Sequence, residues 1–262
     1  MIGTPQSGSV LAALAEFWHP VAWARDVSAE PHAVRLLDKE LVLRRVDGAV
    51  RTRQGAAVER NGLVWLRLAD SGRELPAFPP EQGDPSFRTV DAFDGYYRAN
   101  AARFVENMMD QSHFPWVHEN ILGVRSAPQV SDITVLESTA EVFRYAGDHR
   151  MRYELTPPFQ ILYRVGGPQE GQCLTFLFIG TPISAKEMRS FGFVWCNYAN
   201  KLSDAEIVAR TRTLYEQDRV IVESQRPEEL PLDLAEELHL RGADAAAVEY
   251  RRRLRTLGVT WE

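Results

Sequence analysis

Two histidines near the middle of this 262-residue chain have a spacing that permits metal binding. His113 and His118 are five residues apart, which would separate them by roughly 140° on a continuous helix. Pro115 lies between them. Because proline disfavours helix at the preceding residue and lacks a backbone donor, His113 can end one helix while His118 returns from the next turn. Both imidazoles could then bind one ion.

Two polar side chains precede His113 at helical spacing. Asp110 lies one turn before it, where a carboxylate can accept an imidazole N–H and fix the tautomer of a metal-binding histidine. Asn107 lies one turn earlier and faces the same side. An isolated histidine pair at this spacing would more often be ordinary core or surface residues. These two neighbours favour a metal site instead.

A long helix is predicted from Ser203 to about Gln225. Ser203 can cap its first turn while Glu206 reaches back, which forms a capping box, and Pro227 ends the helix. Apolar and small residues at helical spacing give this helix an inward-facing stripe, composed of Ile207, Thr211, Leu214, Ile221 and Val222. This helix can therefore present a residue to the core.

Asp218 falls inside that stripe, with Leu214 and Val222 one turn to either side. An ionised carboxylate among aliphatic side chains is costly unless a cation meets it. The cation can be a metal ion or an inward arginine such as Arg164. Alternatively, the helix is rotated differently from this prediction and Asp218 does not face the core. The residues alone leave these alternatives open.

The remaining elements are predicted from alternation, turns and helical periodicity. Strand-like runs predict a small β module over residues 17–68, and a Pro- and Gly-rich segment at 74–85 reads as a linker. Asp94 can cap a helix that ends near Gln111. We expect residues 34–45 to form one strand. An antiparallel meander should occupy residues 129–200, and one or two surface helices residues 231–258.

Composition excludes several classes of function. Lys and Arg total 30 against 36 Asp and Glu, and this net charge of -6 argues against a nucleic-acid partner. No apolar run approaches the ~20 residues that a membrane-spanning helix needs. The first basic residue is Arg25, so a secretory signal is not expected and the protein is predicted to be cytoplasmic. Cys173 and Cys196 should remain thiols.

Other histidines and arginines are interpreted as solvated. We expect this of His19, His32 and His149, and of His239 as a helix-surface group. The run from Arg251 to Arg253 is interpreted as a solvated face or a subunit contact.

The histidine segment resembles a known family. The pattern Asn107-x-x-Asp110-x-x-His113-x-x-x-x-His118 is similar to the mononuclear-iron motif of Rieske non-haem iron oxygenase α subunits. The sequence Gln217-Asp218-Arg219 is similar to the late helix that supplies the iron carboxylate in that family. Segments at 18–22, 34–43 and 62–66 resemble the strands of the family's N-terminal domain, so the resemblance covers nearly the whole chain.

The resemblance implies an Fe(II) site held by His113, His118 and Asp218, which leaves one face open for O2 or substrate. In the family, the acid that matches Asp110 links an iron ligand to the cluster of an adjacent subunit. We assign catalytic roles to Asp110 and to Asn107, which would orient His113 and the substrate.

The resemblance also implies an α+β fold of the helix-grip type, an antiparallel sheet with long helices around an apolar cavity. The catalytic domain would occupy residues 76–262, after a truncated β module at 1–75. Aromatic side chains of the later strands are candidates for the cavity wall, and more often fill a sheet for packing alone: Tyr145, Tyr153, Phe159, Phe176, Phe178, Phe193 and Trp195.

One part of the family pattern is missing. A Rieske [2Fe-2S] cluster needs a Cys-x-His and a Cys-x-x-His pair, and neither occurs in this sequence. Where the cluster module would lie, residues 47–61 are long enough only for a short hairpin. The chain is therefore predicted to carry iron but no [2Fe-2S] cluster.

Three functions remain open on this basis. The favoured one is oxidation of a largely apolar or aromatic small molecule with O2, with the substrate or a small reductant as electron source. The second is redox-neutral Lewis-acid chemistry, with Asp110 as base. The third is a non-catalytic ligand-binding or partner subunit. The resemblance further implies a homo-oligomer, a trimer in the family, and allows a separate electron donor.

Overall fold

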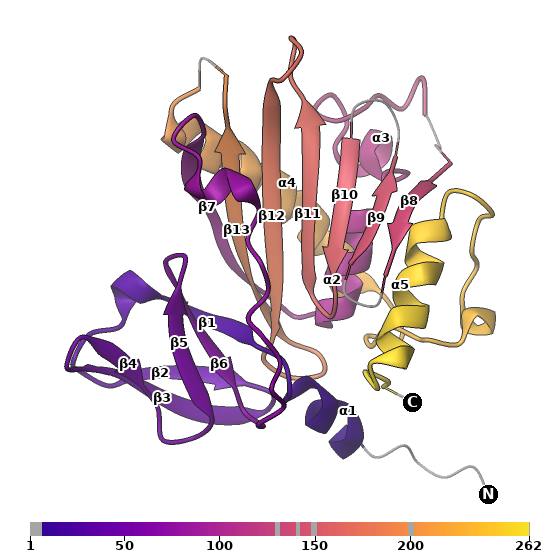
Figure 1. Ribbon diagram of the computed structural model, residues 1–262. Coiled ribbons are helices and arrows are strands. Elements are labelled where there is room, and N and C mark those ends of the chain that lie inside the picture. The colour runs from indigo at the N-terminus through magenta and orange to yellow at the C-terminus, as the bar shows by residue number, and fades with distance from the viewer. Residues whose placement is uncertain (1–6, 129–131, 140–141, 148–150, 199–201, 262) are drawn as a thin grey trace, which may run out of the picture.

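A seven-stranded antiparallel sheet forms the centre of the computed structural model, which describes residues 7–128, 132–139, 142–147, 151–198 and 202–261 (Figure 1). Its strands follow the order β7-β13-β12-β11-β10-β9-β8. Their bounds are β7 Arg88–Tyr97, β8 Thr134–Ser138, β9 Phe143–Ala146, β10 Met151–Thr156, β11 Gln160–Gly166, β12 Cys173–Pro182 and β13 Met188–Cys196. The predicted mixture of helices and antiparallel sheet is confirmed, as is the meander.

The expected helix start at Asp94 is wrong. β7 continues through this residue because it pairs with β13 along its length, with Asp94 opposite Phe191. The Asp94 carboxylate instead accepts hydrogen bonds from Arg189 and from the indole N–H of Trp23. The helix α2 (Ala101–Met109) begins after Asn100, whose side chain accepts a hydrogen bond from a first-turn N–H.

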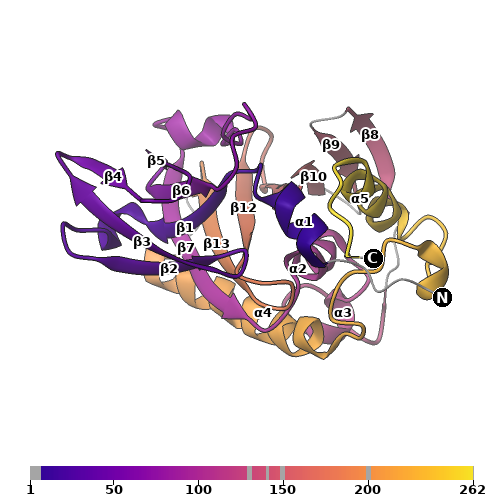
Figure 2. The same cartoon turned by 90° about the horizontal axis from the view of Figure 1, so that it is seen from below.

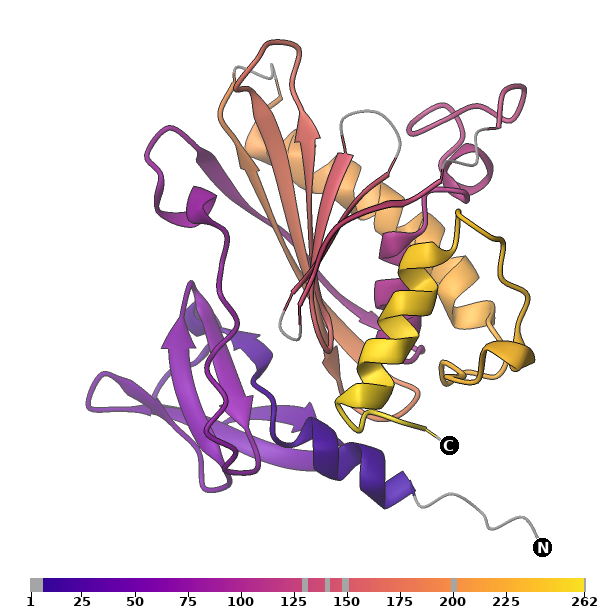
Figure 3. The same ribbon diagram turned by 45° about the vertical axis from the view of Figure 1, so that its right-hand side comes forward.

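Helices α2, α4 (Asp204–Ser224) and α5 (Ala245–Thr256) lie on one side of the sheet (Figure 3). Seen from below, α4 runs along the sheet (Figure 2). Both hydrogen bonds of the predicted capping box between Ser203 and Glu206 are present, and Gln225 follows the last residue of α4. The buried residues of α4 are Ile207, Thr211, Tyr215, Asp218 and Val222. Ile221, predicted to face inward, is exposed instead.

Two three-stranded sheets make up the N-terminal part of the chain (Figure 1). They have the orders β1-β6-β5 and β2-β3-β4, with β1 His19–Trp23, β2 His32–Leu36, β3 Lys39–Val46, β4 Ala49–Arg51, β5 Ala56–Arg60 and β6 Leu63–Arg67. The single strand expected at 34–45 is a hairpin, because Leu37 and Asp38 adopt positive φ angles of 52° and 61° and reverse the chain. A helix, α1 (Ser7–Leu14), precedes these strands.

The N-terminal strands cover the second face of the large sheet. Trp23 of β1 contacts Phe193 of β13 edge-to-face, with 5.3 Å between the ring centroids. Trp195 belongs to the same buried cluster. Because alternate residues of a strand point to opposite faces, Phe193 and Trp195 point away from the helices. Both are therefore core residues, as the favoured interpretation had it, and neither belongs to a cavity wall on the helix side.

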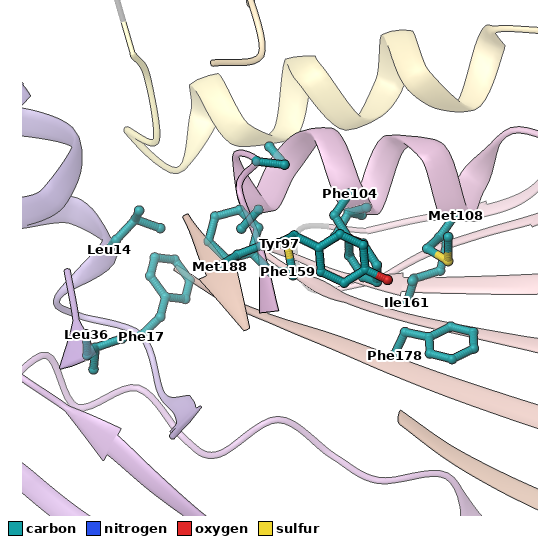
Figure 4. Packing of buried hydrophobic residues seen from close by; sticks show 14 of the residues in the cluster. Leu14, Phe17, Leu36, Tyr97, Phe104, Met108, Phe159, Ile161, Phe178 and Met188 are labelled. Carbon is teal, nitrogen blue, oxygen red and sulfur yellow. The ribbon is translucent and has the colours of Figure 1, made fainter. Parts of the chain in front are cut away.

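The helix side of the sheet holds the larger core (Figure 4). Phe104 of α2 is fully buried and lies near Tyr97 at the end of β7. Leu14 and Phe17, from the start of the chain, belong to the same cluster. One continuous core thus joins the N-terminal part to the helices that carry the histidine segment. No helix among the described residues is long and apolar enough to cross a membrane.

The arginine run on α5 is not a solvated face. Arg251 is 3% exposed and donates to both carboxylate oxygens of Glu106 on α2, at 2.8 and 2.9 Å. Arg253 is 4% exposed and contacts Glu249 at 2.9 Å, so only Arg252 faces solvent. The burial of Arg251 could not be predicted from its neighbours, because its partner Glu106 lies far away in the sequence.

His19 is also buried, although it was expected to be solvated. Its Nε2 atom lies 2.8 Å from the carbonyl oxygen of Leu14. Burial lowers the pKa of His19 to about 4, and the hydrogen bond to Leu14 only partly opposes this effect. The residue is therefore a neutral donor in the folded protein. His149 lies outside the described residues.

The buried neutral form of His19 predicts acid sensitivity. In the unfolded chain a histidine has a pKa of about 6.5. Between that pH and 4, the unfolded chain binds a proton that the folded chain excludes, so acidification lowers the free energy of unfolding. We expect this one side chain to remove about 2 kcal/mol between pH 7 and pH 5.

Urea unfolding of wild type and His19→Gln at the two pH values measures this effect. Glutamine keeps an N–H for the Leu14 carbonyl but does not titrate, so the wild type should lose about 2 kcal/mol more than the variant. Equal losses would contradict the assignment of a buried neutral imidazole.

Candidate metal centre

The two histidines of the candidate centre flank one short helix, α3 (Phe114–Val117). α2 ends at Met109, and His113 immediately precedes α3 while His118 immediately follows it. Pro115 lies in the first turn of α3. The predicted break at Pro115 is wrong, because α2 already ends before Asp110 and the turn of α3 includes the proline. The separate short helix α3 brings both rings to the same side.

The structure brings the three predicted ligand residues together. The Nε2 atoms of His113 and His118 are 3.2 Å apart. Asp218 Oδ1 lies 3.4 Å from the first and 3.1 Å from the second. His118 and Asp218 are 2% and 3% exposed. Three potential ligand atoms, from α4 and from both ends of α3, therefore meet at one buried point.

Two side chains fix the orientation of the imidazole rings. Asp110 Oδ2 lies 3.1 Å from Nδ1 of His113, and Gln217 Oε1 lies 2.9 Å from Nδ1 of His118. Both partners are acceptors, so each Nδ1 carries a proton and each Nε2 is directed toward the centre. Asp110 is itself held by the backbone N–H groups of Ser112 and His113.

This donor set fits a divalent cation. Two nitrogen lone pairs and a carboxylate oxygen repel one another at 3.1–3.4 Å unless positive charge lies between them. Asp218 Oδ1 is buried and has no hydrogen-bond partner among the residues that the structure describes. Ligands about 2.1 Å from a metal and at right angles to one another are about 3 Å apart, close to the separations seen here.

The alternative partner for Asp218 does not meet it. Arg164 of β11 forms two hydrogen bonds with the buried Glu81, at 2.6 and 3.1 Å. Thr175 also donates to Glu81. Arg164 is therefore paired with another carboxylate. Of the two cations considered as partners of Asp218, the metal ion remains.

The electrostatics of the centre also favour positive charge. Burial disfavours the charged form of His113, but the hydrogen bonds and charges of Asp110 and Asp218 outweigh it and raise its pKa to about 9. Burial likewise raises the pKa of Asp218, and the two histidines more than offset this, so its pKa lies below the usual range. The ion-free centre attracts a proton at the place where a metal ion would bind.

An aromatic cavity adjoins the centre. Its walls include His113, His118, Asp218 and Asn107, together with Met108, Phe114, Leu122, Tyr153, Tyr163, Phe176, Phe178, Thr211, Leu214 and Tyr215. Tyr163 contacts the Phe176 ring at 4.8 Å and the Tyr153 ring at 5.7 Å. A metal ion held by the three ligands would therefore meet a largely apolar compartment.

The structure agrees only in part with the predicted cavity wall. Tyr153, Phe176 and Phe178 line the cavity, whereas Tyr145 and Phe159 belong to the neighbouring core. Asn107 is 8% exposed and lies on the wall, and its Nδ2 atom has no partner within the described part of the chain.

Sequence reasoning missed the roles of Gln217, Tyr163 and Tyr215. Gln217 stands next to Asp218 on α4, but its contact with His118 depends on how α4 is rotated. Tyr215 belongs to the same buried stripe as Asp218, at a spacing that could have identified it. Tyr163 lies two residues after Ile161 in β11 and therefore on the same face of the sheet, so the period of the strand was the available signal.

Comparison with known proteins gives a family and several relatives. Residues 97–146 and 140–259 match the family described as the vanillate O-demethylase oxygenase C-terminal domain. The chain is 27% identical over 272 residues to the probable methylxanthine N7-demethylase NdmC of Pseudomonas sp. (strain TJI-51), covering 93% of this chain and 94% of that protein. It is 25% identical to the methylxanthine N1-demethylase NdmA of Pseudomonas putida, covering 76% of this chain and 59% of that protein.

Solved structures share the fold. NdmA of Pseudomonas putida CBB5 with caffeine superposes with a TM-score of 0.83 at 21% identity, covering 95% of this chain and 92% of that chain. Dicamba monooxygenase bound to dicamba gives a TM-score of 0.71 at 17% identity, covering 94% of this chain and 97% of that chain.

Loss of the Gln217 contact should weaken metal binding. We expect Gln217→Met to lower the affinity for Co²⁺ by 10- to 100-fold, because the imidazole of His118 loses the acceptor that orients it. Anaerobic titration followed by the visible absorbance of Co²⁺ measures the affinity. Glu216→Gln, at the neighbouring exposed position of α4, is the matched control. Equal affinities for the two variants would contradict a role for Gln217.

Proposed function

The chain belongs to the family of vanillate O-demethylase oxygenase C-terminal domains, and on that premise we propose that it is a mononuclear non-haem Fe(II) enzyme that oxidises a largely apolar or aromatic small molecule with O2. As a Rieske oxygenase-like protein it is an oxidoreductase, in agreement with the resemblance of the histidine motif. Iron, the substrate class and the electron source are the proposed parts.

One observation carries the proposal. Two Nε2 lone pairs and the unpartnered oxygen of Asp218 face one another beside an aromatic cavity. Two histidines and one carboxylate, with open positions opposite them, form the ligand set typical of non-haem Fe(II) oxygenases. When bound, iron would supply the electron transfer that lets O2 react with an organic molecule.

The chain's own residues position the reactants. His113, His118 and Asp218 would hold the iron, while Asp110 and Gln217 keep the imidazole rings oriented. Apolar side chains surround the cavity, which has a volume of about 40 Å³. An aromatic substrate would therefore have to displace the rings of its wall, where Tyr163 stacks on Phe176. Asn107 would donate a hydrogen bond to a polar atom of that substrate.

We infer oxidative demethylation as the reaction. The family description and the relatives name O- and N-demethylases. Overall, a methyl group on nitrogen or oxygen, O2, two electrons and two protons give the demethylated compound, formaldehyde and water. The methyl carbon is oxidised and O2 is reduced. The favoured substrate is therefore a methylated aromatic or heteroaromatic compound.

A donor outside this chain would supply the two electrons. The sequence lacks the Cys-x-His and Cys-x-x-His pairs of a Rieske cluster, and its two cysteines lie in β12 and β13 of the large sheet. We propose a separate electron-carrying protein as the donor. The sequence favoured the substrate or a small reductant as the electron source and allowed a separate donor. We now favour the separate donor, because demethylation consumes two electrons that the substrate does not supply.

The domain assignment is part of the proposal. Residues 76–262 would form an iron-binding domain of the helix-grip type, and residues 1–75 a β module without cluster ligands. The contacts of Trp23 with Phe191 and Phe193 favour a structural role for that module, because it covers the face of the sheet that is opposite the metal centre.

The redox-neutral alternative gains nothing from the structure. It would need Asp110 as a free general base, but the carboxylate of Asp110 already accepts hydrogen bonds from His113 and from two backbone N–H groups. Its pKa is below the ordinary value: burial raises it, and these interactions outweigh that effect. A carboxylate held in this way orients a ligand better than it accepts a substrate proton.

Iron binding should depend on the triad. After anaerobic incubation with Fe²⁺ and desalting, we expect close to one iron per wild-type chain. His118→Ala and Asp218→Ala should each retain less than a tenth of that amount, because two ligands leave the ion weakly held. Iron is measured by plasma emission spectroscopy. His32→Ala, in β2, is the control and should bind as the wild type does; equal iron in the triad variants would contradict the assignment.

Activity should require both O2 and a reductant. With vanillate or caffeine as probes and dithionite-reduced ferredoxin as donor, we expect formaldehyde to appear in proportion to O2 consumed. Asp218→Ala should reduce the rate by at least 100-fold. Substrate-dependent O2 uptake without any donor would contradict the external electron source. Turnover without O2 would contradict the oxygenase proposal as a whole.

A further inference from the structure

The wall of the aromatic cavity carries no permanent positive charge. Among the described residues, no lysine or arginine lines it. Apart from the three metal ligands, the wall consists of aromatic and aliphatic side chains, the amide of Asn107 and the hydroxyl of Thr211. A carboxylate or sulfonate held in such surroundings loses its hydration and gains no counter-charge from the protein, which is costly. A neutral molecule does not meet this cost.

The cations of the surrounding elements are directed elsewhere. Three arginines of α2, β11 and α4 form ion pairs outside the cavity: Arg103 with Glu237, Arg164 with Glu81 and Arg219 with Glu216. The others on these helices and on β10 are exposed to solvent: Arg152, Arg210 and Arg212. His239 lines a different cleft from the segment before α5, and it does not lie on the helix surface predicted for it.

The metal centre does not supply the missing charge. The carboxylates of Asp218 and Asp110 lie at the centre and would match the two positive charges of Fe²⁺. The imidazoles of His113 and His118 are neutral when they bind a metal ion. The loaded centre therefore adds no net positive charge to the cavity, so an anionic substrate would remain unbalanced there.

Two tyrosines of the wall report the same property. Burial raises the pKa of the Tyr163 hydroxyl well above its ordinary value. Burial also raises the pKa of Tyr153, although the hydrogen bond from Gln111 opposes this effect. In both residues the surroundings disfavour the anionic form. The cavity thus resists a negative charge at two positions of its wall.

The surface beside the cavity is apolar as well. Leu122 lines the cavity and is 44% exposed, so this side chain separates the cavity from solvent. The same segment exposes Ile121 and Trp116, each by 52%. Arg125 follows this turn, but it lies 3.1 Å from Glu119 and is paired with it. A substrate that enters past Leu122 would therefore cross apolar side chains and meet no free positive charge of this turn.

We propose that the aromatic cavity selects an uncharged substrate and discriminates against aromatic carboxylates and sulfonates of the same shape. This narrows the proposed function, on which it rests, to neutral methylated aromatic or heteroaromatic compounds. A neutral polar atom of such a compound can pair with an uncharged group such as the hydroxyl of Thr211. A negative charge finds no lysine or arginine among the described residues of the wall.

Two probe ligands of nearly the same shape test the proposal. At neutral pH, 4-methoxybenzamide is uncharged and 4-methoxybenzoate is an anion, and both carry a methyl ether. Isothermal titration of the full-length, Fe²⁺-loaded chain without O2 or an electron donor measures both affinities. We expect the amide to bind at least about 100-fold more tightly than the carboxylate. Equal affinities, or tighter binding of 4-methoxybenzoate, would overturn the inference.

An added positive charge should change this selectivity. Leu122→Arg should strengthen the binding of 4-methoxybenzoate at least about tenfold, because a cation would then lie beside the bound ligand. Leu122→Gln is the matched control, since it is polar but uncharged, and it should keep the affinity ratio of the two ligands close to that of the wild type. The same ratio in both variants would show that charge is not the basis of selection, which contradicts the proposal.

A third pair of variants shows where the ligands bind. Leu214→Trp puts a larger ring into the cavity wall and should weaken the binding of the amide at least about tenfold. Val220→Trp, at an exposed position of the same helix, should leave it unchanged. Equal binding by these two variants would place the ligand outside the cavity and overturn the inference. Unchanged thermal unfolding temperatures verify that the variants fold.

This test is separate from that of the oxidation. Selective binding of the amide without formaldehyde production, once O2 and a reduced donor are added, would support the cavity's preference and contradict demethylation alone. Formaldehyde production from 4-methoxybenzoate as fast as from the amide, at low equal concentrations, would overturn the preference and leave demethylation in place.

Discussion

Mutual repulsion among three electron-rich atoms is the constraint on which the structure of this protein depends. Nε2 of His113, Nε2 of His118 and Oδ1 of Asp218 lie 3.1–3.4 Å apart in a buried place. The fold holds them there although no protein hydrogen bond to Asp218 Oδ1 is present within the described residues. An arrangement of this kind needs positive charge at its centre. A bound metal ion supplies it, and without one a proton on His113 does, since Asp110 and Asp218 raise the pKa of that histidine to about 9.

The rest of the fold keeps these atoms in place. α4 brings Asp218 and Gln217 to the centre, and its capping box and its packing against β7 fix where the helix starts and how it is rotated. Tyr215, one turn before Asp218, stacks on Phe93 of β7 with 3.5 Å between the ring centroids. On the opposite face of the sheet, the N-terminal strands bury the rings that would otherwise face solvent. The centre is therefore supported by both layers that pack on the sheet.

Local chemistry made part of this arrangement predictable. The cap at Ser203 and the inward stripe of its helix depend on neighbouring residues, so both could be predicted. That both histidines meet Asp218 came from the resemblance of the histidine motif, because the residues alone left the partner of Asp218 open. Contacts between distant segments were not predictable in this way. Asp94 continues a strand because β13 pairs with it, and Arg251 is buried because Glu106, 145 residues away, meets it. The alternation along β13 puts Phe193 and Trp195 on one face of the sheet, and this could be seen in the sequence. The sequence did not show which layer covers each face.

The central claim is that one iron ion binds at the meeting point of the three side chains. Crystals of the protein grown anaerobically with Fe²⁺ and measured at the iron absorption edge test this most directly. We expect a single anomalous peak about 2.1 Å from Nε2 of both histidines and from a carboxylate oxygen of Asp218. A fully iron-loaded protein with its peak elsewhere, or an empty centre in which these side chains bind only one another, would contradict it.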